Sequence, residues 1–410
     1  MNRYVQLVRK QWKLLLYGLV LTFFSSFGQT FLISLFVPSI TRDFALTKTG
    51  FGSIYAGITL ISALNLSYFG RWIDQMSLRS YSVLIAAGLI VGSLLMAISW
   101  SWVVLVSGLL LLRFFGQGLS SHASRTAMAR YFVADRGTAL SIASLGYPLG
   151  EGLLPGLIAT FLAVTSWHLI WAFSSIFILV VLIPLVFYLL HDPLLRKKPK
   201  HVSHPHHEHE EEWHYKDILK DARFYFLFLA VLLPPFWATG LFLYQVSVAH
   251  EMGWSTGLVA AAFAGYATAR VISTLAIGPV IDRLTATRLF PLYLIPFGIG
   301  LLFAAWHPGN WSAFAYLFML GITMGAGVNI KSALYAEIYG TRTLGTVRSL
   351  FSSLVVLSTA ASPFMMGWLL DHGVSITDIL LGATVTVVVA ALLSWRLIYL
   401  KSNPVNSFHA

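Results

Sequence analysis

The sequence predicts an all-α membrane protein with about twelve transmembrane helices arranged in two six-helix halves. Three observations lead to this prediction. The 410-residue chain is 57% hydrophobic and only 10% charged, whereas soluble domains carry about 25% charged residues. The apolar residues form long blocks, each near the ~20 residues that a helix needs to cross the hydrocarbon core. Features of the first half of the chain also recur in the second half at one constant spacing.

The apolar blocks are expected to be helices, because lipid offers the backbone no hydrogen-bond partners. The first block follows a basic segment and is too long for the apolar core of a cleaved signal sequence. The expected spans are residues 13–38, 49–69, 80–100, 103–131, 138–163, 168–190, 223–249, 256–276, 289–306, 311–338, 345–368 and 376–399. Residues 1–190 and 223–410 would each form a six-helix bundle, and residues 191–222 a cytoplasmic, His-rich central loop.

Basic residues gather on one side of these spans. The N-terminal segment, the central loop and most short loops on that side contain Lys or Arg, and only Arg42 and Lys48 fall on the other side. By the positive-inside rule, both termini lie in the cytoplasm, with the protein in the cytoplasmic (inner) membrane. This distribution also accounts for the net charge of +11 without a nucleic-acid partner. The protein is expected to be a monomer.

The central loop carries clustered histidines beside carboxylates, and the chain has no cysteine. Imidazoles and carboxylates can bind Zn, Ni, Co or Cu. No fixed ligand spacing is visible, so a solvated linker is the favoured interpretation, and the weak metal candidates are His204, His206, His207 and His209. No cofactor is expected. The sequence contains no GxxxxGK[ST] loop and no catalytic motif, so we expect neither ATP drive nor an enzyme.

An internal repeat relates the two halves of the chain. A shift of 208 residues aligns "GRWID" (70–74) with "GPVID" (278–282), and it also aligns Pro155 with Pro363. One offset that holds through loops, helices and a proline indicates two related copies of a six-span unit.

Three motifs give this architecture a family resemblance. "GRWIDQMSLRS" (70–80), "LLLLRFFGQG" (109–118) and "GYPLGEGLLPG" (146–156) resemble the loop, fourth-span and fifth-span motifs of the major facilitator superfamily. The resemblance covers essentially the whole chain and implies the major facilitator fold and alternating access. It also implies gating or conformational roles for four residues of the loop motif and its second copy: Asp74, Arg79, Asp282 and Arg283.

A narrower resemblance concerns the fifth span. "YFVADRGTALSIASLG" (131–146) is similar to the signature of monocarboxylate and oxalate/formate-type transporters, and Arg270 occupies the place of their span-eight arginine. The acid that often precedes that arginine by one turn is Tyr266 here.

Few charged residues fall inside the expected spans, where they are usually paired or line a wet pathway. A guanidinium near the middle of span eight matches a carboxylate or phosphate, so Arg270 is predicted to bind substrate; the alternative is a buried pair with an acid on another helix. Arg113 contacts either substrate or span one. Glu151 is either a proton carrier or a partner of Arg113 or Arg125. His122 is either a core residue or a second proton-coupling candidate. Arg125, Lys331 and Glu337 are closer to the cytoplasmic ends of the spans, where they are expected to form gate or snorkelling contacts.

Spans one and seven contain further polar and aromatic residues. Pro234 and Pro235 are predicted to break span seven locally and to leave carbonyls facing a cavity. With Tyr266, the predicted pathway-lining residues on these spans complete the substrate-binding set: Gln29, Trp237, Tyr244 and Gln245.

The sequence therefore predicts a secondary active transporter of a small, monocarboxylate-like organic anion, coupled to protons and surrounded by membrane lipid. Two alternatives within the same superfamily stay open: an efflux pump for drugs or metabolites, and a transporter of a metal chelate or siderophore. A receptor that transports nothing is a further possibility.

Overall fold

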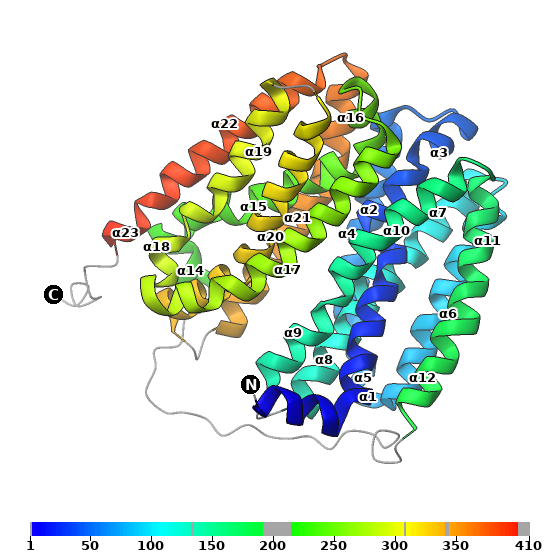
Figure 1. The fold of residues 1–410 in the computed structure, drawn as a ribbon, viewed down its shortest axis with the longest axis horizontal. Helices are drawn as coiled ribbons and strands as arrows, with labels where there is room; N and C mark the ends of the chain where they lie inside the picture. The colour runs from blue at the N-terminus through cyan, green and yellow to red at the C-terminus, as the bar shows by residue number, and fades with distance from the viewer. Residues whose placement is uncertain (1, 133–134, 192–214, 307–308, 341–343, 401–410) are drawn as a thin grey trace. The chain divides into compact units, whose positions relative to one another are not determined.

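The structure, a computed structural model, describes residues 2–132, 135–191, 215–306, 309–340 and 344–400. These residues form helices and no strand (Figure 1). Within the described residues, eleven helical stretches are long and apolar enough to cross a membrane, and the number is twelve if one bent pair counts as a single span. The predicted all-α membrane fold is confirmed.

The chain divides into two compact units, Met1–Val202 with Phe242–Val246, and Ser203–Leu241 with Ser247–Ala410. The earlier helices are α1 (Asn2–Phe24), η1 (Ser25–Gly28), α2 (Thr30–Ile33), η2 (Ser34–Phe36), α3 (Val37–Asp43), α4 (Lys48–Phe69), α5 (Trp72–Gln75), α6 (Leu78–Ala97), α7 (Trp102–Leu111), η3 (Leu112–Ser120), α8 (Ser121–Tyr131), α9 (Arg136–Ser144), α10 (Gly146–Leu162), α11 (Trp167–Phe177), η4 (Ile178–Leu182) and α12 (Ile183–Leu189).

The later helices are α14 (Tyr215–Lys220), α15 (Ala222–Leu243), α16 (Gln245–Glu251), α17 (Thr256–Leu284), α18 (Ala286–Leu289), η5 (Leu292–Leu294), α19 (Ile295–Trp306), α20 (Asn310–Tyr339), α21 (Leu344–Asp371), α22 (Ile376–Trp395) and α23 (Leu397–Leu400). Two differences from the expected boundaries stand out. Helix α17 continues eight residues past the expected end at residue 276, and α14 lies within the range expected to be loop.

Short polar residues start many of the long helices. A Ser or Thr side chain accepts a backbone N–H three residues ahead and so satisfies one of the free amides of the first turn. The residues that cap in this way are Thr47, Ser77, Ser101, Ser166, Ser255 and Ser375.

The expected single helix over residues 13–38 is wrong, because the chain breaks at Gln29. Gln29 is extended (φ −84°, ψ 150°), and the segments on either side, Gln11–Gly28 and Thr30–Asp43, are bent by 43°. A Cβ at Gly28 would overlap the Leu112 carbonyl of η3. The close approach of η1 to η3 therefore depends on a residue without a side chain.

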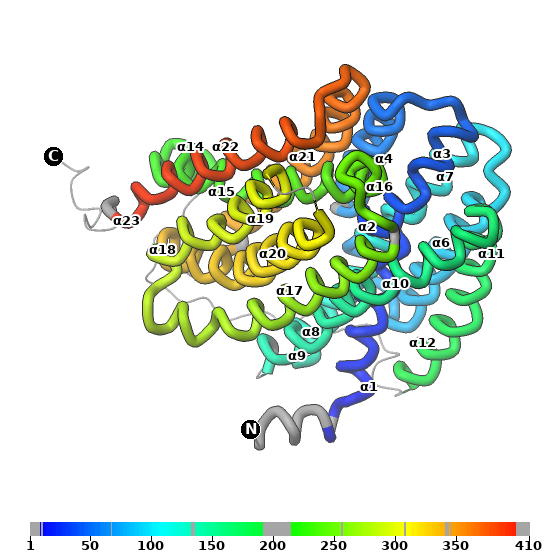
Figure 2. The backbone as a smooth tube through the Cα atoms, turned by 45° about the horizontal axis from the view of Figure 1, so that its top comes forward, coloured from blue at the N-terminus to red at the C-terminus, as the bar shows by residue number. Residues whose placement is uncertain are grey.

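A seam of small residues joins α17 to α20 in the second unit, and the two helices lie side by side in Figures 1 and 2. A Cβ at Gly321 would overlap the Tyr266 carbonyl, and one at Gly325 would overlap the Arg270 carbonyl. One turn further on, Asn329 Nδ2 donates to the Thr274 carbonyl at 2.9 Å. Small residues at four-residue spacing let membrane helices pack closely, so this seam fixes where Arg270 stands against α20.

The predicted local break at Pro234 and Pro235 is also wrong, since α15 continues through both prolines. Pro234 has no N–H to give to the Ala230 carbonyl one turn earlier. The hydroxyl of Tyr293 donates to that carbonyl instead, and Ser358 Oγ donates to the Leu232 carbonyl at 3.2 Å. A side chain from outside α15 thus replaces the backbone bond lost at Pro234, as membrane helices with internal prolines require.

The Tyr293 contact gives a testable double-mutant cycle. Tyr293→Phe should lower the free energy of unfolding by about 1–3 kcal/mol, because it leaves the buried Ala230 carbonyl without a donor. The same change should cost clearly less in a Pro234→Ala background, where residue 234 regains its own N–H. Thermal unfolding of the purified protein measures both effects. Tyr225→Phe, which alters an exposed tyrosine bonded to the Leu219 carbonyl, is the control. Equal costs in both backgrounds would contradict this explanation.

Candidate functional site

Arg113 is the centre of a buried polar cluster in the first unit. It lies on the π-helical segment η3, and only 2% of its surface is exposed. Nη1 donates to the Gly28 carbonyl (3.3 Å), to Thr30 Oγ1 (3.0 Å) and to the Tyr55 hydroxyl (2.8 Å). Nε donates to Thr59 Oγ1 at 3.3 Å. These bonds attach the guanidinium to both sides of the break in span one and to α4.

The positive charge of Arg113 has only neutral partners in the described part of the chain. Its hydrogen-bond acceptors are three hydroxyls and one carbonyl. The Tyr55 ring adds a cation–π contact, with 4.7 Å from Cζ to the ring centroid. Nη2 donates no hydrogen bond to a described residue, so two of the five guanidinium N–H donors are not used there. The cluster therefore offers directed donors and a charge that no described carboxylate neutralises.

Gln29 stands at the break itself, between the two residues that bind Arg113. Its side chain is half-buried and makes no hydrogen bond to the described residues. An amide carries both donors and an acceptor, so this position adds polar recognition beside the guanidinium.

Tyr55 and Thr59 belong to this cluster, but the sequence analysis did not include them. They lie four residues apart on α4, which places their side chains on the same helix face. Two hydroxyl side chains four residues apart on an apolar span are the sequence pattern that could have indicated a polar helix face here.

Glu151 is buried on α10, with 8% of its surface exposed. The interpretation of Glu151 as a partner of Arg113 or Arg125 stays a prediction, as does its role as a proton carrier. Arg125 is exposed, and its Nη2 donates to the Tyr147 hydroxyl at 3.4 Å. Helix α10 packs against α1, η1 and α2, so Glu151 belongs to the same helix layer as the broken span.

In the second unit, Tyr266 and Arg270 lie one turn apart on α17. Tyr266 is buried, with 3% exposed, whereas Arg270 is half-buried. The hydroxyl of Thr274 donates to the Arg270 carbonyl at 2.7 Å. Trp237 is buried too, and its Nε1 donates to Thr386 Oγ1 of α22 at 2.9 Å. The indole N–H is thus used within the helix packing of this unit.

Tyr244 lies between α15 and α16, and Gln245 begins α16; both belong to the segment Phe242–Val246 of the first unit. The Tyr244 hydroxyl donates to the Lys48 carbonyl at 2.6 Å. Gln245 Nε2 donates to Ser34 Oγ at 2.6 Å and to the Phe31 carbonyl at 3.1 Å. Both side chains therefore hold span one and the start of α4. The buried Gln245 Oε1 accepts no hydrogen bond from the described residues.

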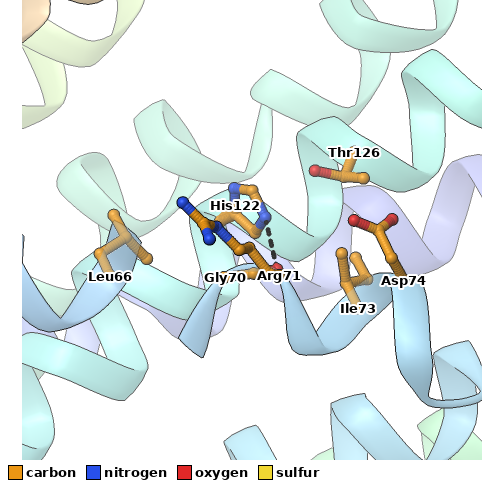
Figure 3. A pocket seen from close by; sticks show the side chains of 7 residues that line it. All are labelled: Leu66, Gly70, Arg71, Ile73, Asp74, His122 and Thr126. Atoms are coloured by element: carbon orange, nitrogen blue, oxygen red, sulfur yellow. Dashed lines mark hydrogen bonds between the residues drawn. The ribbon is translucent and has the colours of Figure 1, made fainter. Parts of the chain in front are cut away.

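His122 and Asp74 line a pocket of about 320 Å³ in the first unit (Figure 3). His122 Nε2 donates to the Gly70 carbonyl at 3.2 Å. Asp74 forms an ion pair with Arg130 of α8. Arg79, at the start of α6, lies over the Phe187 ring with 3.7 Å from Cζ to the centroid. The first copy of the loop motif is thus attached to α8 and to α12.

The second copy of the loop motif is bound differently. Asp282 and Arg283 are exposed, and the residue at the position of Arg130 is Ile338. Instead, the Glu337 carboxylate accepts N–H bonds from Ala286 (2.8 Å) and Thr287 (3.1 Å), just after the left-handed Thr285 (φ 69°). Glu337 therefore caps α18, a role the sequence analysis missed.

The remaining candidates are less informative. Lys331 is half-buried on α20 and forms no ion pair with the described residues. The weak metal candidates His204, His206, His207 and His209 lie outside the described residues. Within the described ranges, no group of three or more His, Asp or Glu side chains is placed to hold a metal ion.

The chain has many helices that are long and apolar enough to span a membrane, and an internal repeat relates its two halves. It also buries charged side chains between helices. Together these features are typical of a polytopic transport protein. The Major Facilitator Superfamily model matches residues 18–246 and 235–408. The chain belongs to this superfamily of secondary transporters, whose members bind small-molecule substrates.

Solved structures share the fold. A bacterial homologue of the human lysosomal transporter Spinster, inward-facing and unoccupied, has a TM-score of 0.71 and 16% identity over 96% of this chain and 98% of its own. Its occupied form has a TM-score of 0.69 and 15% identity over 94% of this chain and 96% of its own. A point mutant of the nucleoside transporter NupG has a TM-score of 0.70 and 12% identity over 94% of this chain and 99% of its own. A search of curated proteins found no match.

Proposed function

We propose that this protein transports a small, monocarboxylate-like organic anion together with protons across the cytoplasmic (inner) membrane, with both termini in the cytoplasm. The observation that carries the proposal is the charge of Arg113. Placing a charge inside a span costs at least about 2.5–3.5 kcal/mol, and the described partners of this guanidinium are all neutral. A substrate carboxylate supplies the missing negative charge.

Arg113 and Gln29 would act at the broken part of span one, the arginine through Nη2 and the glutamine through its amide. Arg270 is proposed as a second anion-binding group, because it is half-buried near the middle of α17 and its planar fork matches a carboxylate. Tyr266 and Trp237 would shape that part of the pathway. Tyr244 and Gln245 would position span one rather than touch the substrate directly.

Coupling to protons suits an anionic substrate. A monoanion that crosses alone works against the membrane potential, at about 2.3 kcal/mol per charge and 100 mV, whereas an anion and a proton together carry no net charge. Glu151 is the first candidate proton carrier because it is a buried acid, and His122 is the second. Asp74, Arg79, Asp282 and Arg283 are proposed as conformational residues of the two loop motifs.

Uptake into proteoliposomes tests the substrate class. Radiolabelled organic acids, drugs and metal chelates are offered with and without a pH gradient, and a carboxylate is compared with its neutral amide. Acids should be taken up faster with the gradient. Arg113→Gln should lower the transport of the carboxylate about tenfold or more relative to the amide, because a charge-assisted hydrogen bond contributes about 1.5–3 kcal/mol. Tyr55→Phe, which keeps the charge and removes one acceptor, is the matched control.

Preferential transport of drugs or of chelates would support one of the two alternatives and refute the organic-anion proposal. A uniform loss of carboxylate and amide transport in Arg113→Gln would assign Arg113 to the support of span one alone.

Arg270→Lys should raise the KM for the anion about tenfold while the protein still folds, since lysine keeps the charge but lacks the planar fork. Uptake kinetics and thermal unfolding of the same preparation measure the two effects. A large fall in melting temperature for Arg270→Ala, with the substrate response of Arg270→Lys unchanged, would assign Arg270 to structure instead of substrate binding.

Glu151→Gln should separate coupling from binding, because glutamine keeps the shape of the side chain but cannot titrate. Counterflow, which needs no net proton movement, should persist, while uptake driven by a pH gradient falls. His122→Gln is measured in parallel as the second candidate. Unchanged gradient-driven uptake in a variant removes that residue as the proton carrier.

A further inference from the structure

The pocket around His122 is built where α4 ends and the chain turns toward α6. Its wall comes from Leu66, from the turn of Gly70 and Arg71, from α5 and from α8 (Figure 3). Its volume of about 320 Å³ is at the lower end of the range for small-ligand sites. The pocket lies wholly within the first unit.

Three donor-bearing side chains line this pocket. Arg71 is exposed and Thr126 is half-buried, and neither side chain makes a hydrogen bond to the described residues. His122 uses Nε2 for the Gly70 carbonyl, which fixes its ring at the wall. In Figure 3, Arg71 lies beside this ring, and the hydroxyl of Thr126 lies on the other side of it.

The acid in the pocket does not cancel this positive character. Asp74 is paired with Arg130, whose Nη1 also donates to the Ile73 carbonyl at 3.4 Å. The Arg71 charge therefore remains. A pocket with net positive charge and unused donors favours an anion.

The position of the pocket adds a second property of the ligand. It lies between two stretches long enough to span a membrane, Lys48–Leu66 and Leu78–Ala97, which places it at the level of lipid headgroups. At this level both a lipid headgroup and a soluble anion can reach the pocket.

We propose that Arg71, His122 and Thr126 form a binding site for a phosphate group. A guanidinium fork binds two phosphate oxygens at once, and the Thr126 hydroxyl offers a donor from the other side of the His122 ring, which suits a tetrahedral anion better than a planar carboxylate. The phosphate belongs either to the headgroup of an anionic phospholipid or to a soluble phosphate. The site is separate from the residues proposed to bind the transported substrate.

Thermal unfolding of the full chain in detergent, followed by tryptophan fluorescence, tests the proposal without any transport assay. The probes are dioctanoyl phosphatidylglycerol, inorganic phosphate, and dioctanoylglycerol, which has the tails but no phosphate. Chloride at matched ionic strength controls for screening. The variants are Arg71→Gln and Thr126→Val, and the matched control is Arg288→Gln, which removes an exposed arginine of the second unit.

A phosphate-bearing probe should raise the melting temperature of the wild type and of Arg288→Gln in a saturable way. Arg71→Gln should weaken the apparent affinity about tenfold or more, and Thr126→Val by a smaller factor. A response to the lipid alone identifies a headgroup, and a response to inorganic phosphate as well identifies a soluble ligand. No saturable response in the wild type, an equal response to dioctanoylglycerol, or an unchanged affinity in Arg71→Gln would each overturn the proposal.

Discussion

A backbone inside hydrocarbon must find its hydrogen-bond partners within the protein, and this constraint governs the places where helices of this chain are interrupted. At the break in span one, Arg113 donates to the Gly28 carbonyl. At Pro234, the Tyr293 hydroxyl replaces the missing amide. At the left-handed Thr285, the Glu337 carboxylate accepts the first amides of α18. In each case a polar side chain from another helix satisfies the backbone, so the residues that look functional by their polarity are also those that hold the irregular segments.

The two related halves meet this constraint with different chemistry. The first half uses a guanidinium in span four, whereas the corresponding position in the second half is Gly321, where α20 packs closely on α17. The loop motif is bound by an Asp–Arg pair in the first half, and a carboxylate cap stands near its copy in the second. The corresponding positions of the two halves thus serve polar contact in the first unit and close helix packing in the second.

The membrane fold could be predicted from the sequence because it depends on local properties, such as the length of an apolar block and the residues that cap it. The break at Gln29 could not, because it depends on Arg113, which is distant in the sequence and is brought to Gly28 only by tertiary packing. The continuity of α15 likewise depends on Tyr293. For the candidate site, the sequence identified the charged residues but not Tyr55 and Thr59. Hydroxyl side chains are common in membrane spans, and only the tertiary contact with Arg113 distinguishes these two.

The π-helical segment Leu112–Ser120 links the two polar regions of the first unit, because it carries Arg113 near its start and is followed directly by α8 with His122. A π-helix holds more residues per turn than an α-helix. If such a stretch returned to α-helical bonding, the helix parts before and after it would turn relative to each other by about 100° for each extra residue taken into the regular winding, which is the angle between successive residues of an α-helix. The winding of this π-helical segment therefore sets the orientation of His122 relative to Arg113. A small change in the winding near Arg113 would rotate His122 about the axis of span four.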